Sequence, residues 1–162
     1  MPAPDPAPPP LCREVIELLS SGVVMSVGTR DAALAPECAP VMGSRVQRDR
    51  RGLTVFVPKA VADATLANLR DNGQIAVNIV RPSDDKSVQV KGHARAVRDA
   101  TDSDRVLQEQ QRSGLVEQLA FVGLPRVIAR RMAWWPSVAI DIDVDDVFVA
   151  TPGPGAGERL SR

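Results

Sequence analysis

The chain has 162 residues, with 20 basic and 20 acidic side chains and a formal net charge of zero. This length suits one domain with a sizeable core, and 44% apolar with 25% charged residues is ordinary for a globular protein. Balanced charge, three Phe, two Trp and no Tyr provide neither a field nor a stacking platform for nucleic acid. We therefore expect no nucleic acid as a partner. No apolar run has membrane-spanning length, so we also expect no membrane as a partner.

Cysteine and histidine content excludes several kinds of catalytic site. Cys12 and Cys38 form no CxxC pair and His93 is the sole histidine, so we expect no metal site. The sequence also lacks a GxSxG nucleophile elbow, a GxGxxG dinucleotide loop and a GxxxxGK[ST] phosphate loop. Residues 1–10 lack the features of a signal peptide, so we expect a cytoplasmic protein with reduced thiols.

Composition divides the chain into three parts. Six of residues 1–10 are proline, and we expect a disordered lead there. Residues 151–162 form a Pro/Gly-rich tail without periodicity. The folded domain is therefore expected at 11–150.

Within this domain, segments with helical and with strand periodicity alternate. The predicted helices, the last of them broken near Gly123 and Pro125, are at 11–20, 61–72, 101–111 and 115–135. The predicted strands are at 23–29, 38–47, 53–57, 75–80, 87–97 and 137–144. Most of these strands follow one another closely, which favours antiparallel pairing. We therefore expect a mainly β (α+β) fold, a six-stranded antiparallel barrel with peripheral helices.

The strand at 87–97 has the most informative pattern. Its apolar face carries Val88, Val90, Gly92, Ala94 and Ala96. Because successive strand side chains point to opposite sides, a row of hydrogen-bonding groups forms the other face: Ser87, Gln89, Lys91, His93 and Arg95. A glycine inside a strand often marks a bulge or the close approach of another backbone or a ligand. The pattern predicts a half-exposed strand, with a binding role for its polar face as the functional interpretation.

Five segments in order carry a family resemblance. They read VMSVGTR at 24–30, RGLTVFVP at 51–58, ANLRDNGQIAV at 67–77, SVQVKG at 87–92 and TPGPG at 151–155. Together they resemble the pyridoxamine 5′-phosphate oxidase-like proteins, which bind FMN on a split β-barrel. The resemblance implies an FMN-binding split-barrel domain. It also implies a homodimer with cofactor sites at the subunit interface.

The resemblance also implies residues for the cofactor site. Phe56 and Val57 would offer backbone groups to the flavin ring, and Thr65 would contact the phosphate at the start of a helix. Ser87 and Gln89 would hydrogen-bond the isoalloxazine or ribityl groups. A phosphate needs positive charge, N–H donors or a helix N-terminus, which agrees with this placement.

One part of the family pattern is missing. Pyridoxamine 5′-phosphate oxidases carry a Ser-Arg-Lys run where this chain has Asp63-Ala64-Thr65, so a basic residue is absent and a negative charge is added. The spacing of Lys59 and Arg45 along the chain would allow either of them to replace the missing basic residue. Vitamin B6 oxidation is therefore not expected.

These observations leave several functional hypotheses. The first is an FMN-dependent oxidoreductase, similar to flavin reductases, acting on a small organic substrate with catalytic residues unassigned. A deazaflavin-dependent reductase is a variant of it. A non-catalytic protein that binds haem or another ligand is a different class, with His93 as the axial ligand. A cofactor-free dimer is the last hypothesis, and Asp63 favours it.

Three further clusters have structural interpretations. Arg126, Arg130 and Arg131 fall at helical spacing on a solvated face, although they would also suit an anionic substrate. Trp134 and Trp135 suit the core or a dimer contact, with stacking on a partner's flavin as the alternative. The acidic residues within 141–146 alternate along a strand and mark its solvent face.

Overall fold

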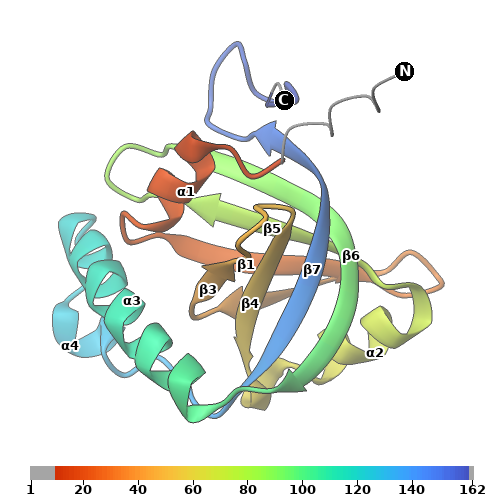
Figure 1. Cartoon of the computed structure of the whole chain (residues 1–162). Helices are drawn as coiled ribbons and strands as arrows, with labels where there is room; N and C mark the ends of the chain where they lie inside the picture. The colour runs from red at the N-terminus through yellow and green to blue at the C-terminus, as the bar shows by residue number, and fades with distance from the viewer. Residues whose placement is uncertain (1–9, 161–162) are drawn as a thin grey trace.

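A computed structural model describes residues 10–160 of the chain (Figure 1). Residues 1–9 of the predicted lead and 161–162 of the predicted tail lie outside the described residues. The described part holds a single curled antiparallel sheet with helices at its ends and rim. Its strands are β1 (Val24–Arg30), β2 (Pro36–Val41), β3 (Ser44–Val46), β4 (Gly52–Pro58), β5 (Gln74–Val80), β6 (Ser87–Asp99) and β7 (Ser137–Val149).

The sheet curls until its two edges meet. The strand order is β2-β1-β5-β6-β7-β4-β3, and β2 runs directly into β3 through Met42 and Gly43. The Met42 N–H donates to the Phe56 carbonyl at 2.8 Å, and the Phe56 N–H donates to the Gly43 carbonyl at 3.0 Å. One bent segment therefore pairs with β1 at one end and with β4 at the other. The predicted mainly β barrel with peripheral helices is confirmed, but it has seven strands and not six.

The difference in strand number arises at Gly43. The sequence predicts one strand at 38–47, and the structure breaks it where the chain leaves β2 for β3. A Cβ on Gly43 would lie 2.9 Å from the Gln108 side chain and 3.4 Å from the Phe56 ring. A glycine is required there because the bend passes closely under these two side chains.

Aliphatic side chains fill the interior. Every residue of β4 is buried, and the inward positions of β1, β5, β6 and β7 belong to the same cluster, with Val27, Val77, Val90 and Ile140 fully buried. The alternation predicted for β6 is confirmed from Val88 to Gly92. Beyond Gly92 it is wrong: the pairing of β6 with β7 shifts register twice, and the strand moves away from the core.

The helices are α1 (Arg13–Leu19), α2 (Asp63–Asn72), α3 (Asp102–Phe121) and α4 (Arg126–Ala129), with a 3₁₀ turn, η1, at Lys59–Val61. Thr101 caps α3, in a reciprocal capping box with Asp104. The predicted break near Gly123 and Pro125 is confirmed, since it separates α3 from α4. The predicted gap between 111 and 115 is wrong, because α3 is continuous to Phe121, and the predicted helix ends before Trp134 and Trp135. No helix in the described residues is long and apolar enough to cross a membrane.

The described part of the tail folds back on the barrel. Its Arg159 forms a β-bridge with Phe148 of β7. Thr151 also contacts the start of β6, because its hydroxyl accepts from the Ser87 N–H at 2.9 Å. The first residue of β6 is thereby covered.

Gly92 provides a test of the β6–β7 bulge. A Cβ at this position would lie 2.1 Å from the Asp143 carbonyl oxygen, which is backbone and unable to rotate away. We expect Gly92→Ala to lower the free energy of unfolding in urea by about 2 kcal/mol. Gly28→Ala is the control, because a Cβ there meets nothing within 4 Å. Equal effects of the two substitutions on unfolding would contradict the assigned bulge.

Candidate functional site

The outward face of β1, β5 and β6 carries small and polar side chains. Ser26, Asn78 and Gln89 are register partners across the three strands, and Gly28, Ala76 and Lys91 form the next row. Apart from the more exposed Lys91, all of these residues are partly exposed. Since strand side chains project perpendicular to the sheet, a flat molecule can approach the backbone closely here.

A groove of about 340 Å³ continues this face toward the ends of the strands. Gly28 and Ala76 form part of its floor, and its charged or titratable lining residues are Arg30, Lys91, His93 and Asp145. A Cβ added to Gly28 would meet no atom within 4 Å, so the floor is open at that point. The volume is at the lower end of the range for small-ligand pockets, roughly 300–1,000 Å³.

His93 stands at the rim of the groove with its orientation fixed. Its Nδ1 lies 2.8 Å from Asp145 Oδ2. Because a carboxylate only accepts, Nδ1 carries the proton in this contact, and no described residue bonds Nε2. The sole histidine therefore offers one ring nitrogen to a ligand.

The two cations of the groove have neutral partners. Arg30 donates to the Gln74 side-chain oxygen at 3.1 Å and to the Asp31 carbonyl at 3.1 Å. The Lys91 ammonium lies 5.2 Å from the centre of the Phe148 ring. Among residues 10–160, neither cation forms an ion pair with a carboxylate.

Thr65, predicted to contact a cofactor phosphate, is fully buried in a polar cluster below α2. Its hydroxyl donates to Glu37 Oε2 at 2.8 Å, and the Thr29 hydroxyl donates to the same oxygen at 3.1 Å. Asn68 in turn donates to the Thr29 hydroxyl at 3.0 Å. The hydrogen-bonding capacity of Thr65 is therefore directed at a carboxylate.

Arg45 and Lys59, the predicted basic replacements, are both in ion pairs. Arg45 Nη2 lies 2.6 Å from Asp104 Oδ1, and Lys59 Nζ lies 2.7 Å from Asp99 Oδ1. Phe56 uses its backbone N–H and carbonyl to close the barrel, and Val57 is fully buried opposite Val138.

The two predicted ring contacts differ in access. Ser87 is buried, since its carbonyl accepts from the N–H groups of Ala150 and Thr151. Gln89 lies on the partly exposed outward face of β6. Gln89 thus lies on the outward face of β1, β5 and β6, which the groove continues. The other predicted residues do not come together with it.

An FMN phosphate does not fit between Arg45, Lys59 and Thr65 as they lie. Each has a carboxylate partner, and Asp63 stands in the first turn of α2. These assignments stay predictions. Sequence reasoning missed Gly28 and Arg30 as groove residues, although a glycine inside the predicted strand at 23–29 was the signal that could have found them.

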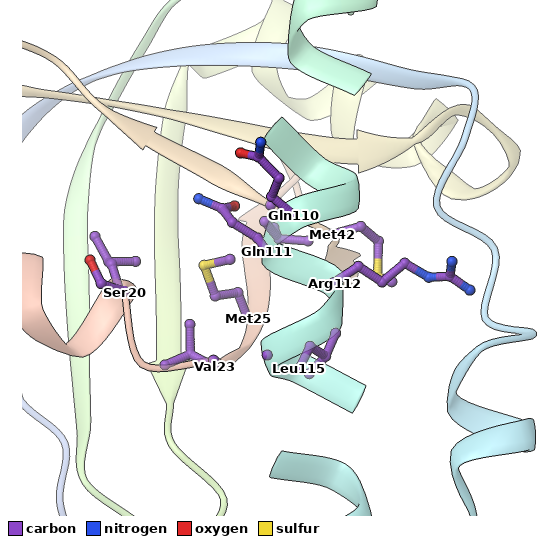
Figure 2. Close-up of a pocket in the computed structure, with 13 residues that line it drawn as sticks. Ser20, Val23, Met25, Met42, Gln110, Gln111, Arg112 and Leu115 are labelled. Atoms are coloured by element: carbon purple, nitrogen blue, oxygen red, sulfur yellow. The ribbon is translucent and has the colours of Figure 1, made fainter. Parts of the chain in front are cut away.

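A second cavity, of about 300 Å³, lies between α3 and the barrel (Figure 2). Its lining combines apolar side chains such as Met25, Met42 and Leu115 with polar ones. Gln111 is engaged, since its amide bonds both the N–H and the carbonyl of Ser44. Arg112 extends away from Met25 in Figure 2 and donates to the Arg130 carbonyl, which lies outside the lining.

Comparison with known proteins identifies the fold. No family model and no curated protein matches the sequence. HupZ of Group A Streptococcus superposes with a TM-score of 0.54 and 19% identity, over 90% of this chain and 99% of HupZ. A candidate pyridoxamine 5′-phosphate oxidase from Lactobacillus delbrueckii gives 0.54 and 14%, over 86% and 93%. An F420 reductase gives 0.51 and 13%, over 81% and 93%.

The fold is that of the pyridoxamine 5′-phosphate oxidase-like split barrels. The resemblance predicted from the five sequence segments is therefore confirmed at the level of fold. In this split barrel, the interior is filled with aliphatic side chains. A ligand site is accordingly expected on the outside, where the groove face lies.

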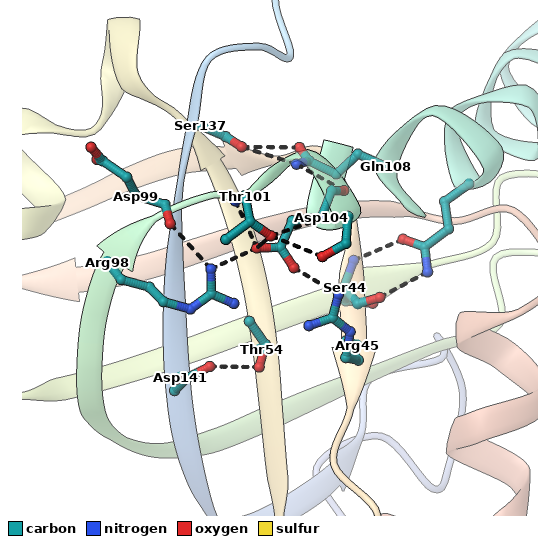
Figure 3. A network of polar contacts seen from close by, with 12 residues as sticks. Ser44, Arg45, Thr54, Arg98, Asp99, Thr101, Asp104, Gln108, Ser137 and Asp141 are labelled. Atoms are coloured by element: carbon teal, nitrogen blue, oxygen red, sulfur yellow. Dashed lines mark hydrogen bonds and ion pairs between the residues drawn. The ribbon is translucent and has the colours of Figure 1, made fainter. Parts of the chain in front are cut away.

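A buried ionic network fixes α3 to the barrel (Figure 3). The Asp104 side chain is 1% exposed and lies 2.6 Å from both Arg45 and Arg98. Burial alone would raise the pKa of its carboxyl, but hydrogen bonds from Arg98, from Thr101 and from Arg45 outweigh burial and hold the pKa well below its ordinary value. Gln108, one turn further, bonds Ser137 of β7 at 3.0 Å.

We expect Asp104→Asn to lower the free energy of unfolding by roughly 3 kcal/mol at neutral pH, because the buried carboxylate that two partly exposed arginines contact loses its charge. The folded-state pKa is lowered, so the contribution is complete above the unfolded value of about 3.9 and declines as the pH falls below it. The difference between wild type and variant should therefore stay constant above about pH 5 and narrow progressively as the pH falls below about 4, as measured by urea unfolding.

Asp84→Asn is the matched control for this measurement. The exposed Asp84 also has an arginine partner, and the hydrogen bond from Arg81 lowers the pKa of its carboxyl to about 2. Solvent screens this pair, so we expect little change in the free energy of unfolding. If the two variants lost equal stability, the structural role of the Asp104 network would be refuted.

Proposed function

We propose that this chain binds a flavin-type cofactor, FMN or a deazaflavin, and acts as an oxidoreductase on a small organic substrate. The observation that carries the proposal is the partly exposed row Ser26, Asn78 and Gln89 on the outside of a split barrel. Solved proteins of this fold include a candidate pyridoxamine 5′-phosphate oxidase and an F420 reductase. A bound flavin supplies hydride transfer itself, which is why the reaction class follows from the cofactor.

The side chains of the row suit the edge of an isoalloxazine ring. The amides of Asn78 and Gln89 each provide donors and an acceptor, which match the carbonyl and N–H groups of such a ring. Gly28 and Ala76 beside them add little bulk above the sheet. The residues of this chain would thus orient the ring and bring it close to the backbone.

The proposal includes a homodimer. The face holding the row has partly exposed residues from β1 to β6, and Val24 at its edge is 39% exposed. A ring bound there would be open to solvent on its other side, and a second copy of the chain would cover it. The free thiols Cys12 and Cys38 agree with the reducing cytoplasm as the proposed location.

We expect the purified protein, mixed with FMN or a deazaflavin and separated from unbound ligand, to retain a flavin absorption spectrum. Gln89→Leu should weaken the retained cofactor's affinity roughly tenfold, because one amide contributes about 1–1.5 kcal/mol of hydrogen bonding. Gln110→Leu, the same substitution on α3, is the control. No flavin spectrum with either cofactor would reject the proposal and favour the cofactor-free dimer.

A second candidate function is haem binding, and His93 favours it. An imidazole whose Nδ1 is held by a carboxylate has its Nε2 oriented for a metal, as in many histidine ligands. Arg30 and Lys91 are cations that would suit the carboxylates of a haem.

Under this second candidate, the protein with added haem shows a Soret band shifted from that of free haem. His93→Ala should abolish the shift, whereas Asp145→Asn should lower the affinity for haem by about 10- to 100-fold. A Soret shift that persists in His93→Ala would exclude His93 as the axial ligand.

A further inference from the structure

We propose that the groove beside Gly28 is the anion site of this chain: Arg30 and Lys91 hold the phosphate or carboxylate of a flat organic ligand. The anion has two sources, the phosphate of the cofactor or a free organic anion such as an aromatic carboxylate. Where it is the cofactor's phosphate, the inference rests on the proposed function. It replaces the predicted set Arg45 and Lys59.

Charge compensation distinguishes the two sets of cations. Arg45 and Lys59 each lie within 2.7 Å of a carboxylate, so their charge is already used. Arg30 is oriented by the neutral Gln74 amide and Lys91 by the Phe148 ring. These neutral partners fix both side chains and leave their positive charge available to a ligand.

The shape of the groove selects a flat ligand. Gly28 has no side chain, Ala76 beside it has one methyl group, and the space above Gly28 is empty within 4 Å of an added Cβ. A planar molecule can therefore lie on the sheet while its anionic group reaches Arg30 and Lys91 at the rim.

His93 adds a hydrogen-bonding position for the ligand. Its Nδ1 proton is directed at Asp145, so Nε2 is the ring nitrogen left for a ligand at the groove. A ligand hydroxyl, which can both donate and accept, satisfies it. The ligand class is thus a flat organic anion that carries a hydroxyl group, which includes both FMN, with its ribityl hydroxyls, and a hydroxybenzoate.

The test measures binding by calorimetry and flavin fluorescence with four probes: FMN, riboflavin, benzoate and 4-hydroxybenzoate. The variants are Lys91→Gln and Gly28→Leu, with Lys59→Gln as the matched control, and thermal unfolding confirms that each is folded. Wild type should bind 4-hydroxybenzoate more tightly than benzoate by about fivefold, the size of one hydrogen bond. Lys91→Gln should weaken anion binding at least tenfold, Gly28→Leu should abolish it, and Lys59→Gln should leave it unchanged.

The flavin pair identifies the source of the anion. A preference for FMN over riboflavin that disappears in Lys91→Gln supports the inference with the cofactor's phosphate as the anion. Equal binding of FMN and riboflavin, with Lys91-dependent binding of 4-hydroxybenzoate, supports it with a free organic anion. If no flavin binds and the binding of 4-hydroxybenzoate still depends on Lys91, the inference stands and the proposed function fails.

Two results would overturn the inference. One is the absence of anion binding to wild type with every probe. The other is a loss of FMN or hydroxybenzoate binding in Lys59→Gln that equals or exceeds the loss in Lys91→Gln. The second result would return the anion to the predicted residues near η1.

Discussion

The closing of the sheet at Met42 and Gly43 is the constraint on which the rest of the structure depends. Two backbone hydrogen bonds to Phe56 join β2 and β3 to β4, so the segment that begins at one edge of the sheet ends at the other. A closed sheet leaves few unpaired strand edges and fixes the tilt of every strand. It also decides which side chains point inward, because the period of two leaves no freedom once the register is set.

Closure on a small circumference determines where a ligand can bind. The interior of such a barrel is just wide enough for its own side chains, and Val27, Val77, Val90 and Ile140 fill it. The outward face of β1, β5 and β6 remains partly exposed and is lined by small residues. The same alternation that builds the core therefore places Gln89, Lys91 and His93 on the outside, and Lys91 and His93 line the groove.

Sequence reasoning predicted what depends on neighbours along the chain. Alternation located most of the strands, and helical periodicity located the helix at 61–72 and the start of the helix at 101, where α2 and α3 lie. Gly92 indicated a bulge or a close approach, and the structure has both. The bend at Gly43 was not predicted, since it depends on side chains brought near by tertiary packing. The same reason applies to Thr65: its position in the helix was predicted, but its partner Glu37 comes from another strand.

The net charge can be read from the sequence, whereas the fold determines which cations are paired with carboxylates. A net charge of zero argues against an anionic partner for the molecule as a whole, yet it does not describe each site. Asp104 neutralises Arg45 and Arg98 inside the fold, so these cations serve stability. Arg30 and Lys91 have no such carboxylate among the described residues. Two cations without a carboxylate partner consequently line this groove, although the chain is neutral overall.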